Sequence, residues 1–369
     1  MAQRSFCTRR CLVIGVILLG GVLAGSHKAA AQPSRVPEIW FTPMQNAVKA
    51  DGVGVTITKH DFLAMMAHPE QWPHAKSRIS EMTLDTVHFV ENRVDLPAIV
   101  AWSNRQNFQI GTSGSIVYTD HICNPHMEGI TDDVGVAREI AVTTHVWKEA
   151  GGRLDYFIMD SPLVFGYYAA QTKCHFSIEE VAIRAATTVK AILEDYPNVK
   201  IVDAEGPASM LPSAWLPDYE RFLSSFQKAS AKPIDYLAMD MHWFDDWHTG
   251  YNWVTASREI ITFVHARGVK VGLIINADDR FVEVGEGIKT KETVTAKDWM
   301  QANRNHMQIA HDEKLPLDAI IINSWMKFPK WNLPESDPSA YASLVNDAYR
   351  IWAGQRDRSA TGSPVGVHR

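Results

Sequence analysis

The sequence predicts an α/β fold, a (β/α)8 TIM barrel formed by a single domain with long loops after its strands. Short, continuously apolar segments alternate with helix-like segments, which is typical of parallel strands buried on both faces. Most of these apolar segments end in acidic residues or Asn, the arrangement by which a barrel builds a site at one rim. An open, doubly wound sheet would show the same alternation. The barrel is favoured because no Gly-rich phosphate loop follows the first strand and polar strand ends recur along the chain.

The first 31 residues have the features of a secretory signal peptide. Arg4, Arg9 and Arg10 precede an apolar stretch, and the small residues 29–31 precede Gln32. The alternative is an uncleaved membrane anchor, but the apolar stretch is short for a spanning helix. We therefore expect cleavage after residue 31, a secreted or periplasmic protein, and no stable membrane insertion of the mature chain.

No compositional break divides the rest, so residues 32–353 are predicted to form the barrel and residues 354–369 a flexible polar tail. Four of the 36 basic residues leave with the signal peptide, so the mature chain has 32 basic and 42 acidic residues, a net charge of −10. That charge argues against nucleic acid or an anionic membrane as a partner but permits a neutral sugar. We expect a monomer.

The first half of the chain contains three expected strands and three expected helices. The first strand covers 38–41, and a helix follows over 62–79 with Asp61 as a candidate N-cap. The second strand lies within 79–87. The remaining expected elements are a helix at 96–105, a strand at 108–110 and, after a long loop, a helix at 134–149 that Gly151 and Gly152 end.

The second half shows five clearer strand–helix units. Ser177 and Glu180 form a capping-box pattern before the helix at 181–194. The expected strands are 154–159, 199–202, 236–239, 271–275 and 319–322, and the other expected helices are 216–230, 254–266, 296–312 and 340–352.

Carboxylates at the strand ends are the candidate catalytic groups. Asp160 and Glu205 end the fourth and fifth strands, and each is followed by a small residue and a Pro. Two carboxylates on neighbouring strand ends can differ in protonation, as glycosidic cleavage requires of its acid and its base or nucleophile. Asp240, at the end of the sixth strand, can face Asp160 across the barrel, so the pair is Asp160 with Glu205 or either of them with Asp240. The alternative is a pair of helix caps or salt bridges at the barrel rim.

Aromatic and amide side chains at the same strand ends suit sugar binding, because rings stack on pyranose faces and amides or carboxylates bind hydroxyls. The expected substrate-binding residues are Trp40, His242, Trp243, Asn276, Asp278, Asn323 and Trp325. Asp240, His242, Asp246 and His248 could instead hold a divalent metal ion. The interleaved Trp243 and Trp247 favour a sugar platform, so we expect no metal and no cofactor.

Two cysteines remain after signal cleavage, an even count in an exported chain. Cys123 and Cys174 fall in loops after neighbouring strands, so we expect a disulfide that ties these two loops together. Two free buried thiols are the alternative.

These motifs together resemble the broad superfamily of (β/α)8-barrel glycoside hydrolases. The resemblance rests on Met159-Asp160-Ser161-Pro162, Asp203-Ala204-Glu205-Gly206-Pro207, Asp240-Met241-His242-Trp243 and Asn323-Ser324-Trp325 and covers about residues 37–353. The largest clan of these enzymes has an Asn-Glu pair ending strand 4 and a Glu ending strand 7, where this chain has Met159-Asp160 and Asn276. The resemblance therefore implies the architecture and a carbohydrate substrate but assigns no catalytic residue.

The expected function is an exported, metal-independent glycoside hydrolase acting on a poly- or oligosaccharide. Asp160 and Glu205 are the leading catalytic residues and Asp240 is the third. A carbohydrate-binding barrel without catalysis is one alternative, and a metal-dependent hydrolase that uses Asp240, His242 and His248 is the other.

Overall fold

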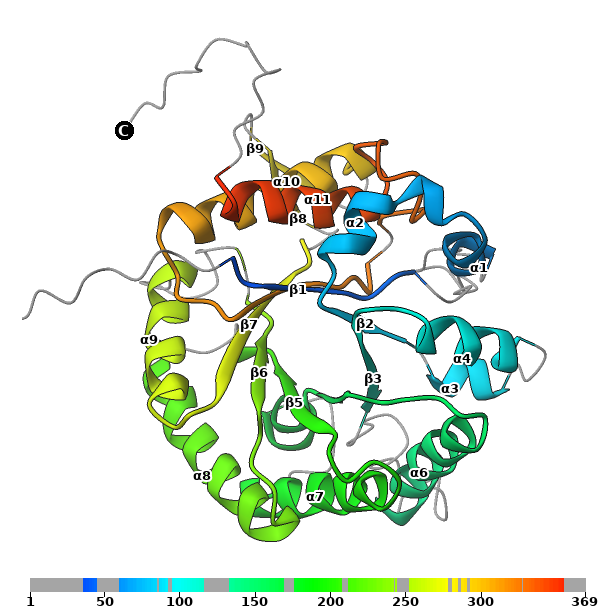
Figure 1. Ribbon diagram of the computed structural model, residues 1–369. Coiled ribbons are helices and arrows are strands. Elements are labelled where there is room, and N and C mark those ends of the chain that lie inside the picture. The colour runs from blue at the N-terminus through cyan, green and yellow to red at the C-terminus, as the bar shows by residue number, and fades with distance from the viewer. Residues whose placement is uncertain are drawn as a thin grey trace, which may run out of the picture. The chain divides into compact units, whose positions relative to one another are not determined.

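Eight parallel strands close into a barrel, which confirms the predicted fold (Figure 1). The computed structural model describes residues 36–44, 60–84, 86–91, 95–115, 133–168, 176–207, 212–241, 243, 252–277, 281–284, 287–290, 293–326 and 328–354. Neighbouring strands follow chain order, and the last barrel strand pairs with the first. The barrel strands are β1 (Glu38–Phe41), β2 (Glu81–Thr83), β3 (Gln109–Ser115), β4 (Tyr156–Asp160), β5 (Lys200–Glu205), β6 (Tyr236–Met239), β7 (Lys270–Ile275) and β10 (Ala319–Ile322).

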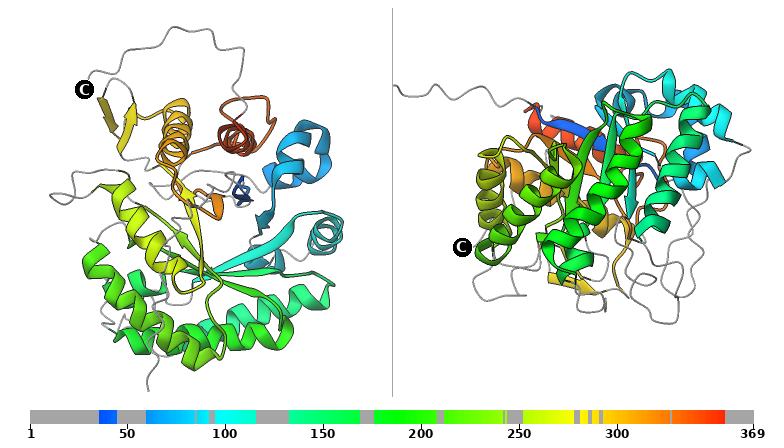
Figure 2. Two further views of the ribbon diagram at one scale, coloured as in Figure 1. Left: turned by 60° about the vertical axis from the view of Figure 1, so that its left-hand side comes forward. Right: turned by 90° about the horizontal axis from the view of Figure 1, so that it is seen from below.

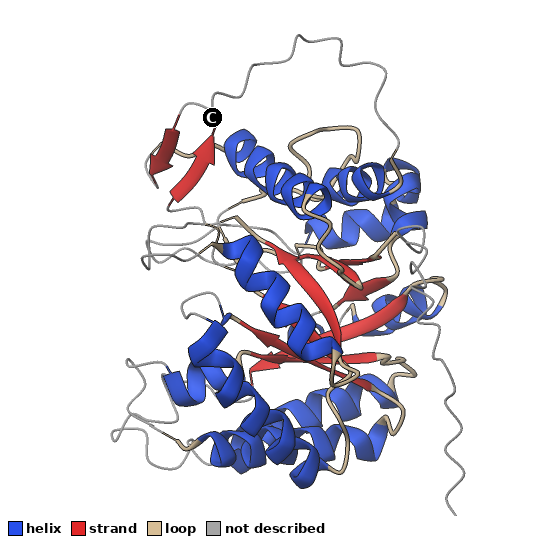
Figure 3. Cartoon of the chain, turned by 90° about the vertical axis from the view of Figure 1, so that its left-hand side faces the viewer, coloured by secondary structure: helices blue, strands red, loops and turns tan. Residues whose placement is uncertain are grey.

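A ring of helices surrounds the strands (Figures 1 and 3). The α-helices are α1 (His60–Ala67), α2 (Pro73–Arg78), α3 (Thr86–Glu91), α4 (Leu96–Asn104), α6 (Asp133–Glu149), α7 (Ile178–Asp195), α8 (Pro212–Ser230), α9 (Trp253–His265), α10 (Ala296–Asp312) and α11 (Ala342–Trp352). Local signals set several of their ends. The Ser177 hydroxyl accepts the N–H of Glu180 at the start of α7, as predicted, and Thr295 and Asp298 form a reciprocal capping box at the start of α10.

The prediction of one helix over residues 62–79 is wrong in one respect, because the helix is interrupted. It forms α1, a short 3-10 turn η1 (Pro69–Gln71) and α2. Pro69 and Pro73 each lack the N–H that a continuous helix needs at that position, and each begins a new element instead. Asp61 is not an N-cap, since α1 begins one residue earlier at His60.

A two-stranded antiparallel hairpin, β8 (Phe281–Val284) and β9 (Gly287–Thr290), is inserted between β7 and α10. It was not expected from the strand–helix alternation. The hairpin contacts α10 and does not join the barrel (Figure 2).

Two hydrophobic clusters form the core. The larger one lies between the barrel strands and the helices, and the smaller one fills the barrel. Inside the barrel, the ring of Trp40 packs 4.8 Å from the rings of both Tyr156 and Tyr236. Gly111 leaves the space that this filling needs, because a Cβ there would lie 2.0 Å from a carboxylate oxygen of the buried Glu81.

All the described residues belong to one compact unit. Among them, no helix combines the length and apolar character needed to cross a membrane. The predicted signal peptide, the tail after residue 354 and both Cys123 and Cys174 lie outside the described residues.

Candidate active site

Three alternate barrel strands share a seven-residue pattern that ends at the mouth, the rim formed by the C-terminal ends of the strands. The segments are 154–160, 234–240 and 317–323, and they contain β4, β6 and β10. Each has an apolar residue, an Asp, four mostly apolar residues and a final Asp or Asn. The three copies therefore place Asp160, Asp240 and Asn323 at equivalent positions.

The Asp at the second position of the pattern fixes the strand register. One carboxylate oxygen of Asp155, Asp235 and Asp318 accepts the backbone N–H of Ile110, Ile201 and Val271, respectively, at 2.8, 2.8 and 2.9 Å. Each donor belongs to the preceding strand of the barrel. The same bond at the N-terminal end of three alternate strands makes their C-terminal ends equivalent as well.

The final residues of the pattern point into the mouth. Ile158, Ala238 and Ile321, two residues before them, belong to or pack against the cluster inside the barrel. Side chains two residues apart on a strand share a face, and alternate strands contribute to one layer of a barrel. Asp160, Asp240 and Asn323 therefore form one layer above that cluster, and all three are partly exposed.

The separation of the two carboxylates follows from barrel geometry. Their strands are two positions apart, about 10 Å along the barrel wall at roughly 4.8 Å per strand. Side chains that point toward the axis converge, so the two carboxyl groups lie closer to each other than their backbones do. Retaining and inverting glycosidases hold their two carboxyl groups about 5–9.5 Å apart.

Glu205 has a different place from the one its sequence position suggests. It is fully buried, whereas the sequence interpretation places it at the rim facing a cleft shared with Asp160. Asp160 pairs in register with Ala204, so Glu205 points to the opposite, outer face of β5. Its two carboxylate oxygens accept the backbone N–H groups of Leu163 at 2.6 Å and Val164 at 3.2 Å.

Asp203 lies on the same outer face and is also fully buried. Burial raises the pKa of Asp203 to about 8. Burial and the neighbouring Asp203 raise the pKa of Glu205 as well, and the two backbone N–H groups only partly oppose the rise. Glu205 accepts two backbone N–H groups, which favour its ionised form, whereas Asp203 accepts none within the described residues.

Two of the expected sugar-binding tryptophans are buried. Trp40 has no exposed surface and lies inside the barrel, below the mouth. Trp243 is 7% exposed and stacks on His306 of α10, with 4.2 Å between ring centroids. Its indole N–H donates to the carbonyl oxygen of Asn276, so it ties the end of β6 to the end of β7. Neither ring has an exposed face on which a sugar could stack.

The end of β10 provides accessible groups instead. The side chain of Trp325, two residues after Asn323, is 55% exposed.

Asn276 follows β7 and is 4% exposed, and its side-chain amide has no hydrogen-bond partner among the described residues. His242 and Asp278 lie outside the described residues.

The metal alternative stays a prediction. In the described part of the chain, no three His, Cys, Asp or Glu side chains gather closely enough to hold a metal ion. His242, Asp246 and His248 lie outside that part.

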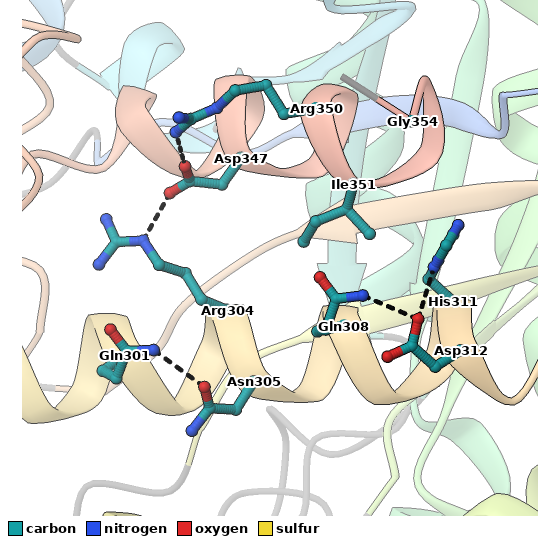
Figure 4. A pocket seen from close by; sticks show the side chains of 10 residues that line it. All are labelled: Gln301, Arg304, Asn305, Gln308, His311, Asp312, Asp347, Arg350, Ile351 and Gly354. Atoms are coloured by element: carbon teal, nitrogen blue, oxygen red, sulfur yellow. Dashed lines mark hydrogen bonds and ion pairs between the residues drawn. The ribbon is translucent and has the colours of Figure 1, made fainter. Parts of the chain in front are cut away.

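A polar groove of about 700 Å³ lies away from the mouth, on the outer surface between α10 and α11 (Figure 4). Its charged groups are already paired. Asp347 of α11 accepts from Arg304 of α10 at 2.6 Å and also from Arg350 (Figure 4). We assign this groove to helix packing.

The seven-residue pattern is the signal that best selects the mouth residues, and it is present in the sequence. When each strand end is considered separately, Glu205 is as good a catalytic candidate as Asp160. Aligning the three copies selects Asp160, Asp240 and Asn323 and leaves Glu205 out, because β5 does not carry the pattern.

Comparison with known proteins identifies the class of fold. The structure of GH5_18 from Streptomyces cattleya in complex with GlcNAc matches with a TM-score of 0.51 at 13% sequence identity, over 90% of this chain and 83% of that chain. Xylanase 10B from Thermotoga maritima matches with a TM-score of 0.49 at 11% identity, over 87% and 97%. A thermostable mutant of the xylanase Xyn10A from Cellvibrio japonicus gives 0.49 at 11%, over 86% and 98%.

The GH5_18 match shows a shared fold, in keeping with the closed barrel of eight parallel strands. No protein-family model matches the chain. A search of curated protein sequences also found no match. The fold class is thus established, and the specific family is not assigned.

Proposed function

We propose that the protein is an exported glycoside hydrolase that cleaves a poly- or oligosaccharide without a metal ion, with Asp160 and Asp240 as its catalytic carboxylates. The observation that carries the proposal is their equivalent position in one inward-facing layer at the mouth of the barrel. A glycosidase needs one carboxylic acid to protonate the leaving oxygen and one carboxylate to act as nucleophile or base. The pair Asp160 and Asp240 replaces Asp160 and Glu205 because Glu205 is buried on the outer face of β5.

Neighbouring groups support a sugar as the ligand. Asn323 lies in the same layer as the two carboxylates, and its amide can bind a hydroxyl. Trp325 offers an exposed ring just beyond it. The GH5_18 barrel, which shares this fold, was solved with GlcNAc, which is in keeping with a carbohydrate ligand here.

The test is turnover on a panel of glycans with the mature protein. We expect Asp160→Asn and Asp240→Asn each to lower the rate by about a hundredfold or more, because each removes an acid or base. The matched control is Asp235→Asn, which removes a carboxylate at the opposite end of the Asp240 strand but keeps a side-chain oxygen that can accept the Ile201 N–H. It should keep near-native turnover.

A chelator added to the same assay should leave cleavage intact. Restoration of a lost activity by zinc or manganese would favour the metal-dependent alternative. The assignment of the pair is wrong if both Asp160→Asn and Asp240→Asn retain near-native turnover on a glycan that the wild type cleaves.

A further inference from the structure

The chain leaves β4 through a short turn with an unusual backbone. Ser161, directly after Asp160, has a φ of 47°, a left-handed conformation that non-glycine residues adopt only when their surroundings enforce it. Its N–H donates to the carbonyl oxygen of Ala204 at 2.7 Å, and its carbonyl oxygen accepts from the N–H of Phe165 at 2.9 Å. The π-helix η2 (Val164–Tyr168) follows. This turn directly follows Asp160 in the chain.

The side chain of Glu205 holds the turn from behind. Leu163 and Val164 begin a helical turn, where backbone N–H groups have no partner in the helix itself. The carboxylate of Glu205 accepts both N–H groups from the adjacent strand, and the Glu205 and Leu163 side chains are fully buried, so water does not compete. This bond pair anchors residues 161–168 to β5.

The backbone of Glu205 contacts the other proposed catalytic residue. Its carbonyl oxygen accepts the N–H of Asp240 at 2.9 Å. One residue on β5 therefore fixes the turn after Asp160 through its side chain and the N–H of Asp240 through its main chain.

We infer that Glu205 is a positioning residue for the carboxylate pair, in which its side chain sets the geometry of Asp160 by anchoring the turn at residues 161–168. The inference rests on the proposed function for its catalytic consequence. It gives this buried acid a role that does not require contact with substrate. Sequence position alone suggests a catalytic role for it, and the burial of its side chain on the outer face of β5 explains why the two roles differ.

Glu205→Gln tests the side chain with little change in shape. The Gln oxygen can keep the bond to Leu163, but its amide nitrogen is a donor and faces the N–H of Val164, which loses its acceptor. Asp203→Asn is the matched control, because Asp203 lies on the same strand, on the same face and equally buried, and accepts no backbone N–H within the described residues.

The kinetic readout separates positioning from binding or folding. On a glycan that the wild type cleaves, we expect Glu205→Gln to lower kcat by about ten- to a hundredfold, since small misplacements of a reacting group have effects of this size. KM should change by less than about threefold, and Asp203→Asn should keep both constants within about threefold. A change in KM at constant kcat, or an equal loss of kcat in Asp203→Asn, would overturn the inference.

Hydrogen exchange of the turn gives a readout that does not depend on turnover. Amides in residues 161–168 should exchange at least about tenfold faster in Glu205→Gln than in the wild type or in Asp203→Asn. Unchanged exchange in Glu205→Gln overturns the inference whatever the activity. If the wild type cleaves no glycan while exchange still rises in Glu205→Gln alone, the anchoring stands and the proposed function fails.

Discussion

Residue type predicts chemistry at this mouth, but surroundings decide whether the chemistry is available. Trp325 and Trp243 have the same side chain and both follow strand ends. Trp325 is 55% exposed, whereas Trp243 is 7% exposed and packs between α9 and α10, edge-on to Trp253 and stacked on His306. One ring can meet a ligand and the other stabilises the fold.

Replacing each Trp by Ala should separate these roles. Trp325→Ala should raise KM about tenfold, equivalent to about 1.4 kcal/mol of binding free energy, and leave the melting temperature unchanged. Trp243→Ala should lower the free energy of unfolding by about 3–5 kcal/mol, because it opens a cavity in the core and breaks the bond to Asn276. Steady-state kinetics and thermal unfolding measure the two effects. Equal losses of stability in both variants would show that Trp325 is a structural ring as well.

The sequence indicates the candidate mouth residues more reliably than it indicates their accessibility. Asp160, Asp240, Asn323 and Trp325 are all identified from strand ends alone. Trp40 is also at a strand end, but it lies inside the barrel because β1 presents it to Tyr156 and Tyr236. Accessibility depends on neighbours from distant parts of the chain, which a single strand end does not reveal.

At the scale of the element, the alternation of side chains along a strand decides between functional and structural carboxylates. On β5, Ala204 faces the barrel interior while Asp203 and Glu205 face the helices. The apolar run 319–322 is predicted with its observed bounds because it is buried throughout. The hairpin of β8 and β9 is missed although Gly285-Glu286 between two short runs is a hairpin signal.

The buried acids on β5, Asp203 and Glu205, make the folding stability of the protein depend on pH. Burial raises the pKa of Asp203 to about 8, whereas an unfolded Asp titrates near 3.9. Between about pH 4 and pH 8 the folded chain therefore holds a proton that the unfolded chain has lost, and its stability falls as pH rises. Glu205 shifts in the same direction, and Tyr219 of α8 and Asp160 are the titratable groups that act on the pair.

Asp203→Asn should flatten this dependence. The fall in melting temperature between pH 5 and pH 8 should be smaller in the variant than in the wild type, and a part should remain because Glu205 still titrates. Glu149→Gln changes a 66% exposed carboxylate on α6 and serves as the control. An unchanged pH dependence in Asp203→Asn would show that Asp203 is ionised in the folded protein throughout this range.

At the scale of the whole molecule, closure of the barrel is a property that no single element shows. The alternation of strands and helices also fits an open sheet, and the pairing of β1 with β10 is what closes it. Closure forces side chains from all strands into one interior, where large and small residues must alternate. Trp40 occupies the centre, and Gly111 and Gly272 on other strands leave room for Glu81 and Ile321, respectively.

Substitution of Gly111 tests whether the barrel interior needs a glycine beside Glu81. A Cβ at residue 111 would lie 2.0 Å from Oε1 and 3.1 Å from Cδ of Glu81. Glu81 is fully buried and its carboxylate accepts the hydroxyl of Thr83 at 3.0 and 3.2 Å, so a movement away from residue 111 would disturb that bond. Gly111→Ala should therefore lower the free energy of unfolding by about 1–3 kcal/mol, the usual effect of overpacking a core.

A double-mutant cycle identifies the cause. In a Glu81→Ala background the same Gly111→Ala change should be clearly less destabilising, because the overlapping carboxyl group is gone. Gly206→Ala is the control for the substitution itself, since a Cβ there would meet its nearest neighbours at 3.8 and 3.9 Å, an ordinary contact. Denaturant unfolding of all variants at one pH measures the cycle. If the effect of Gly111→Ala is the same with and without the Glu81 side chain, its source is the glycine's backbone, and the barrel interior has room for a methyl group beside Glu81.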